Sequence, residues 1–187
     1  MSTQIEATTE DLIRELYEVD GKAEIVNGKI FRYPPTGHVQ AYAEGEMFAS
    51  LRAHSKKISG THRRAMMCCV AFLCDLPHRK CFCPDLSYYT GKPSGMKFPP
   101  EPPVFAVEVR SEGDYGKRAE EAMASKRDDY FAAGTLVVWD VDLLSEDTIK
   151  FYSAAAPQNP RVFRRGETAH AEPAVPGWAM PVNDLFA

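Results

Sequence analysis

Hydrophobic and polar residues alternate along the chain with two spacings, one helical and one typical of strands. Apolar positions recur at helical spacing over 8–20, with Thr8 or Thr9 as N-cap, over 37–55, and over 114–134, with Gly134 as C-cap. Short runs rich in β-branched, aromatic and other apolar residues predict strands. These runs are 23–26, 29–33, 65–73, 86–89, 104–109, 136–141, 149–152 and 161–164.

The first two strand-like runs predict a β-hairpin. Asn27-Gly28 lies between them, and this dipeptide tolerates the positive φ of a tight primed turn. Pro34-Pro35 ends the second strand. The proline-rich tail after 164 is predicted to be irregular.

Composition indicates one globular domain over 1–187. The 187 residues are 44% hydrophobic and 26% charged, which excludes a disordered tail, a collagen-like repeat and a coiled coil. No apolar run is long enough to cross a bilayer, and the polar start lacks the features of a signal peptide. We therefore expect a soluble, cytoplasmic protein with no membrane partner.

One segment of the chain has the charge to contact a polyanion. The net charge of -4 removes the argument from a basic domain as a whole. Between Glu46 and Asp75, however, there is no acidic residue. A solvated helix end and loop is an equally good interpretation of this segment. Its basic residues are Arg52, Lys56, Lys57, Arg63 and Arg64, with His54 and His62.

The cysteines favour reduced thiols over a disulfide framework. There are five, an odd number, all between Cys68 and Cys83, and no secretory signal precedes them. Cys81 and Cys83 raise the alternative of a zinc site, but their Cys-x-Cys spacing is not the usual Cys-x-x-Cys. Small buried side chains are the preferred interpretation.

A lysine stands in the apolar stripe of the third predicted helix. At about 100° per residue, Lys126 projects onto the same face as Met123 and Tyr130. Because a buried ammonium needs a carboxylate partner, this helix is predicted to point Lys126 at negative charge inside the fold. The alternative is that the side chain reaches past the stripe into solvent.

Two carboxylates on predicted strands could supply that charge. Glu108 interrupts the apolar run 104–109 on the same face as Arg110, and Asp85 stands just before another strand. An ion pair between Glu108 and Arg110 or Lys126, without chemistry, would also explain this pattern. Together, however, two carboxylates and a lysine are what metal-assisted phosphodiester hydrolysis needs. Carboxylate oxygens suit Mg²⁺ or Mn²⁺, and the lysine can orient or help deprotonate a water and stabilise the transition state.

The order of these residues resembles the Uma-type family of restriction endonucleases, within the PD-(D/E)XK nuclease superfamily. The resemblance extends from the hairpin 23–29, through the helix that opens near His38, to the ending 176–186. The motifs that carry it are Pro84-Asp85, Glu108-Val109, Lys126 with Tyr130 and Gly134, and Val138-Trp139-Asp140-Val141-Asp142.

That resemblance implies a restriction-endonuclease-like α/β fold, in which helices flank a mixed central sheet. It also implies Mg²⁺ or Mn²⁺ held by Asp85 and Glu108, with Lys126 as the catalytic lysine. Arg110 stands where the simplest superfamily pattern has its lysine, and in the Uma-type family the following helix supplies that lysine instead. Glu24 matches an early carboxylate of the family that could complete the metal shell; an exposed hairpin glutamate is an equal alternative.

The predicted function is therefore a metal-dependent endonuclease that hydrolyses DNA and leaves a 5′-phosphate. His38 and Arg110 join the basic segment as expected nucleic-acid contacts, and by analogy a homodimer would bring two active sites to one duplex. The alternative is a binding or regulatory protein that keeps the nuclease fold and cuts nothing. Two carboxylates and a lysine in apolar surroundings argue against that alternative. A zinc-stabilised interaction module ranks third.

Overall fold

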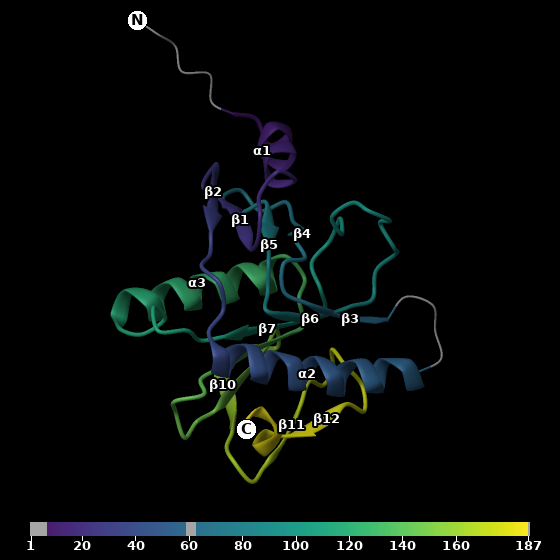
Figure 1. Cartoon of the computed structure of the whole chain (residues 1–187), viewed down its shortest axis with the longest axis vertical. Helices are drawn as coiled ribbons and strands as arrows, with labels where there is room; N and C mark the ends of the chain where they lie inside the picture. The colour runs from purple at the N-terminus through teal and green to yellow at the C-terminus, as the bar shows by residue number, and fades with distance from the viewer. Residues whose placement is uncertain (1–6, 59–62, 187) are drawn as a thin grey trace, which may run out of the picture.

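A mixed six-stranded sheet organises the chain, which confirms the predicted fold class (Figure 1). The computed structural model describes residues 7–58 and 63–186. Strands β7 and β8 are parallel, and every other neighbouring pair in the order β10-β9-β8-β7-β6-β3 is antiparallel. The strands are β3 (Arg64–Met67), β6 (Leu86–Tyr89), β7 (Phe105–Val109), β8 (Val137–Val141), β9 (Ile149–Ser153) and β10 (Ala156–Phe163).

Two helices cover opposite faces of this sheet (Figure 1). Helix α2 (His38–Lys57) packs Met47 and Leu51 into the larger core, together with the odd-numbered apolar residues of β7. Helix α3 (Lys117–Ala132) is the crossover between the parallel strands and packs Tyr130 on the other face. Because successive strand residues point to opposite faces, Glu108 is directed to the side of α3.

The predicted N-terminal hairpin forms a separate two-stranded sheet above the central one (Figure 1). Helix α1 (Thr9–Leu16) precedes it, with Thr8 as N-cap in a capping box. Strands β1 (Ala23–Val26) and β2 (Lys29–Arg32) are joined by Asn27 and Gly28, whose φ angles are 49° and 68°. The hairpin packs against the short pair β4 (Phe72–Leu73) and β5 (Cys81–Phe82), and the Lys80 amide donates to the Ile25 carbonyl.

One strand and one helix illustrate how the structure differs from the sequence prediction. The strand expected over 65–73 ends at Met67, because the chain turns at Cys69, whose φ is 69°. The third helix begins at Lys117 rather than near Asp114, since Gly116, with a φ of 90°, directs the chain into it.

The prediction of an irregular tail is wrong for its last part. Strands β11 (Thr168–His170) and β12 (Ala179–Pro181) pair, and a 3₁₀ turn, η1 (Val182–Leu185), follows them. The buried side chains of Trp178, Val182 and Leu185 complete the core beneath α2. Burial of apolar area against the sheet therefore orders this segment despite its prolines.

All five cysteines are free thiols, and Cys81 and Cys83 are buried as predicted. Among residues 7–58 and 63–186, no helix combines the length and apolar character that a membrane crossing requires.

Candidate active site

Lys126 lies in a buried cluster of carboxylates. Its Nζ is 2.8 Å from Glu108 Oε1 and 2.8 Å from Glu24 Oε1, and its side chain is 15% exposed. The predicted approach of Lys126 to negative charge is therefore present, and the side chain does not run out to solvent. Burial lowers the pKa of Lys126, but Glu108 and Glu24 outweigh it and raise the pKa well above the usual lysine value.

Glu24 anchors this arrangement from the hairpin. Its side chain is fully buried, and the Cys83 amide donates to Oε1 at 3.0 Å. Arg79 donates to Oε2 at 2.5 Å, and the Tyr33 hydroxyl donates to the same oxygen at 3.1 Å. Burial raises the pKa of Glu24, but the Lys126 ammonium and the Arg79 guanidinium hold it at about 2. Both oxygens are thus engaged inside the fold, so the alternative of an exposed hairpin glutamate is wrong, while a part for Glu24 in a metal shell stays a prediction.

Asp85 and Glu108 share a second ammonium, that of Lys22. Lys22 Nζ is 2.5 Å from Asp85 Oδ1 and 3.8 Å from Glu108 Oε2. The other Asp85 oxygen accepts from the Val109 amide at 2.8 Å, and the other Glu108 oxygen accepts from the Tyr130 hydroxyl at 2.7 Å. Each carboxylate is therefore held in place by one oxygen and presents the other to the same cation.

A fourth carboxylate, Glu44, reaches the cluster from α2. Its residue is 4% exposed, and it forms no ion pair within the described part of the chain. Burial raises the pKa of the Glu44 carboxyl to about 7, and nearby Asp85 adds to the rise while Lys22 opposes it. We call Lys22, Glu24, Glu44, Asp85, Glu108 and Lys126 the carboxylate–lysine cluster.

The sequence interpretation missed Lys22, Glu44 and Arg79, although two of them carry a recognisable signal. Glu44 stands at helical spacing from the buried Met47 and Leu51, the argument that singled out Lys126. Lys22 lies two residues before Glu24, so both fall on one side of an extended segment. For Arg79, which lies in the loop before β5, we find no comparable signal.

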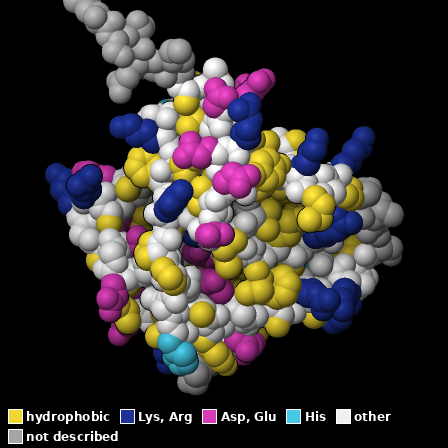
Figure 2. Space-filling model, turned by 45° about the horizontal axis from the view of Figure 1, so that its top comes forward, with side chains coloured by type: hydrophobic (Ala, Val, Ile, Leu, Met, Phe, Trp, Pro, Cys, Tyr) yellow, Lys and Arg dark blue, Asp and Glu magenta, His cyan; other side chains and the backbone are white. Residues whose placement is uncertain are grey.

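The predicted nucleic-acid contacts occupy different surroundings. Arg52, Lys56 and Lys57 on α2, with Arg63 and Arg64 at β3, are exposed, and none forms an ion pair within the described residues. Figure 2 shows basic side chains gathered at the right of the view, beside the grey atoms there. Acidic side chains are recessed near the middle of the same face. His38 is exposed at the start of α2. His62 lies outside the described residues.

Arg110 is placed elsewhere than the sequence interpretation expected of a phosphate contact. Its side chain is 2% exposed, and its guanidinium binds Asp140 through Nε at 2.7 Å and through a second nitrogen at 2.8 Å. Glu120 of α3 engages the same guanidinium. With its donors committed inside the fold, Arg110 is not free to meet a phosphate.

The donor chemistry of Asp85 and Glu108 fits a hard divalent cation. Their two facing oxygens already converge on one positive group, the Lys22 ammonium, which stands in for a cation. Among the described residues no group of three His, Cys, Asp or Glu side chains could hold an ion by itself. Mg²⁺ nevertheless needs only one or two carboxylates, since it keeps several waters and adds substrate phosphate oxygens.

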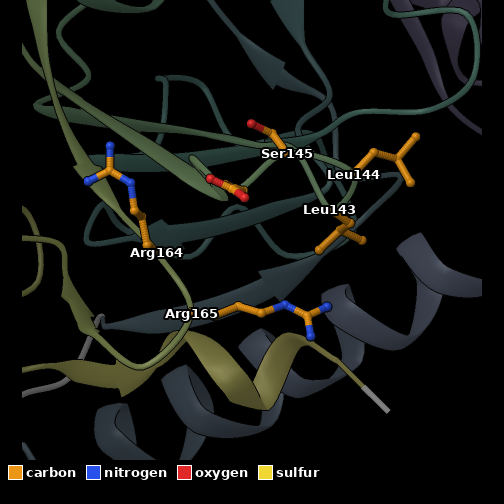
Figure 3. A pocket seen from close by; sticks show the side chains of 6 residues that line it. Leu143, Leu144, Ser145, Arg164 and Arg165 are labelled. Carbon is orange, nitrogen blue, oxygen red and sulfur yellow. The ribbon is translucent and has the colours of Figure 1, made fainter.

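A pocket of about 450 Å³ lies apart from this cluster (Figure 3). Residues 143–146 line it together with Arg164 and Arg165. Arg164 is paired with Asp147 at 2.6 Å, and Arg165 stacks over the Phe186 ring. No member of the carboxylate–lysine cluster lines this pocket, so it does not contribute to the site.

Comparison with known proteins agrees with this geometry. The family model described as "Uma2: Putative restriction endonuclease" matches residues 9–183. A solved structure, described as a "putative nuclease belonging to DUF820" from Anabaena variabilis, has the same fold with a TM-score of 0.70 at 17% identity. The match covers 93% of this chain and 96% of that one. No curated protein shows significant similarity to the chain.

Proposed function

Since the chain belongs to the Uma2 family of restriction endonucleases, we propose that it is a metal-dependent endonuclease that hydrolyses DNA phosphodiester bonds. Family membership and the shared fold support a nuclease. The observation that carries the proposal is the convergence of Asp85, Glu108 and Lys126, distant in sequence, within one charged cluster.

In this proposal Asp85 and Glu108 would hold Mg²⁺ or Mn²⁺. Such an ion supplies charge neutralisation at the phosphate and a more acidic water. Glu24 fixes the Lys126 ammonium beside Glu108. Lys126, beside Glu108, is placed to stabilise charge on the phosphate, and Glu108 and Glu24 raise its pKa in the metal-free protein.

The exposed basic residues of α2 and β3 supply a surface for the DNA backbone. Positive side chains without internal partners attract phosphates irrespective of base sequence. The carboxylate–lysine cluster itself is acidic, so in this proposal DNA is held at the basic surface. Cleavage takes place at the cluster, where a divalent ion would offset the carboxylates. His38, at the exposed start of α2, is proposed as an additional phosphate contact.

The first test separates metal binding from cleavage. Calorimetric titration of Mn²⁺ should give saturable binding to the wild type that is lost in Asp85→Asn, which keeps the size of the side chain. Asp75→Asn is the matched control, because the Asp75 side chain is 99% exposed and its ion pair is with Lys80, outside the cluster. A folded wild type that binds no Mn²⁺ contradicts the proposal.

Cleavage is then assayed on supercoiled plasmid and on single-stranded circular DNA with Mn²⁺. Lys126→Met should bind the metal and cut far more slowly than the wild type. A wild type that binds Mn²⁺ and DNA but cuts neither substrate supports the second candidate, a nuclease-fold binding or regulatory protein. The excess of carboxylates at the site, which repels a phosphate in the absence of metal, is the observation that favours this candidate.

A further inference from the structure

Two lysines enter the carboxylate–lysine cluster, and they are held differently. Lys126 contacts Glu24 and Glu108 at 2.8 Å each. Lys22 contacts Asp85 closely and Glu108 only at 3.8 Å. Glu24, which ties Lys126 in place, forms no ion pair with Lys22. Each lysine thus pairs with two carboxylates, but only one of the two contacts of Lys22 is close.

The oxygens that Lys22 contacts are the two that the proposed metal would use. Asp85 Oδ2 is occupied by the Val109 amide and Glu108 Oε1 by Tyr130 and Lys126. The remaining oxygens, Asp85 Oδ1 and Glu108 Oε2, both face Lys22 Nζ. A divalent ion on these oxygens and an ammonium at the same place would repel each other strongly at such short range.

We propose that Lys22 is an internal counter-ion that occupies the divalent-cation position of the metal-free protein and is displaced when Mg²⁺ or Mn²⁺ binds. This inference rests on the proposed metal site and deepens it, because it names the residue that sets the metal affinity. Lys22 holds Asp85 and Glu108 together without a metal, and it competes with the metal for them.

The position of Lys22 in the chain suits displacement. Lys22 stands immediately before β1. Its ammonium is at the end of a long flexible side chain that is 16% exposed. Its backbone is fixed, since the Tyr33 amide donates to the Lys22 carbonyl at 2.9 Å. The ammonium can thus leave the carboxylates by side-chain rotation while the hairpin stays in place.

Mn²⁺ titration of three lysine variants tests this competition. Lys22→Gln removes the competing charge, and its Mn²⁺ dissociation constant should fall about tenfold relative to the wild type, the scale of one charge-assisted contact. Lys22→Arg keeps the charge and should bind Mn²⁺ about as weakly as the wild type. Lys80→Gln, which breaks a lysine–carboxylate pair with Asp75 outside the cluster, is the matched control and should leave the affinity unchanged.

The outcomes separate this inference from the proposed function. Equal or weaker Mn²⁺ binding by Lys22→Gln, with binding by the wild type intact, overturns the competition and leaves the metal site standing. Absence of Mn²⁺ binding in all folded variants overturns the metal site and this inference with it.

A second measurement needs no substitution and covers the case in which Lys22→Gln does not fold. Lysine acetylation of the wild type, followed by mass spectrometry, should proceed at least about fivefold faster at Lys22 under saturating Mg²⁺ than with chelator. Lys80 should react at the same rate in both conditions. A Lys22 rate that saturating Mg²⁺ does not change overturns the inference.

Discussion

Glu108 of strand β7 and Arg110, which follows that strand, lie two residues apart, and the two clusters around them are built differently. Around Arg110, one guanidinium meets Asp140 in a two-point contact and Glu120 in another, which we call the arginine cluster. Around Glu108, each lysine of the carboxylate–lysine cluster is shared by two carboxylates. The contact between Lys22 and Glu108 is 3.8 Å long. In addition, Glu44 is buried there without an ion pair in the described part of the chain.

The difference separates a structural ion pair from a site that can react. In the arginine cluster the planar guanidinium binds the buried Asp140 carboxylate and the exposed Glu120 carboxylate in fixed geometry, so none of its donors remains for a ligand. In the carboxylate–lysine cluster, Glu44 is buried without an ion pair in the described part of the chain, and its carboxyl has a raised pKa. A desolvated carboxyl with a perturbed pKa is typical of functional sites.

Arg110→Met should break the arginine cluster with the largest loss of stability. Asp140, whose side chain is 4% exposed, would remain buried without its cation. We expect the free energy of unfolding in urea to fall by ~3–5 kcal/mol. The exposed pair of Arg164 and Asp147 gives the control, and Arg164→Met should cost ~0–1 kcal/mol. Equal losses in the two variants would contradict the assignment of Arg110 to structure.

Lys126→Met should affect the other cluster chiefly through activity. Plasmid cleavage under saturating Mn²⁺ should slow by about 10²–10³, the typical effect of losing one charge-stabilising donor. Stability should fall less than in Arg110→Met, because Glu24 keeps Arg79 and Glu108 keeps Tyr130. Lys117→Met, an exposed lysine on the same helix, should cut at the wild-type rate. Wild-type cleavage by Lys126→Met would remove the distinction between the clusters.

Glu44→Gln should sharpen the comparison through pH. Folded Glu44 keeps its proton up to about pH 7, whereas the unfolded chain releases it near 4.5, so the wild type loses stability as the pH rises between these values. With chelator present, Glu44→Gln should abolish this loss and exceed the wild type at pH 8 by ~1–3 kcal/mol. Urea unfolding at pH 5 and pH 8 measures it, and Glu46→Gln on the same helix controls for the change in charge. If the stability of the wild type did not fall between pH 5 and pH 8, the raised pKa of Glu44 would be contradicted.

Tyr130→Phe should give the smallest effect. The hydroxyl donates to Glu108 Oε1 at 2.7 Å, but Lys126 remains at that oxygen, so the loss in unfolding free energy should be ~0.5–1.5 kcal/mol. Thermal or urea unfolding measures it. Tyr115→Phe removes a comparable hydrogen bond to Asp142 from a half-exposed ring and should cost less. A larger loss in Tyr115→Phe would show that the Glu108 contact is of little value.

Local patterns predicted most of the fold because most of its helices, strands and turns are specified by short stretches of sequence. The turn at Asn27 and Gly28, the cap at Thr8 and strand β6 need only neighbouring residues to specify them. The tail was misread because its prolines suggested irregularity. The buried Trp178, which packs on Trp139 with ring centroids 5.2 Å apart, shows that tertiary burial decides there.

The site was predictable where a single residue contradicts its local surroundings, and not where partners meet only in space. Lys126 and Glu108 each interrupt an apolar pattern, and they are in contact. The partner of Arg110 depends on the parallel register that aligns Glu108 with Asp140, which no local pattern encodes. Arg79 likewise gains its role from the arrival of Glu24 and Asp129 from distant segments.

The hairpin β1–β2 is not part of the six-stranded sheet. The segment 22–33 that contains it nevertheless brings Lys22, Glu24 and Tyr33 to the site. The candidate site is therefore completed by a segment that lies outside the central sheet. Exchanging that segment should alter the charge and the cation preference of the carboxylate–lysine cluster, while the sheet and its two helices keep their own sequence.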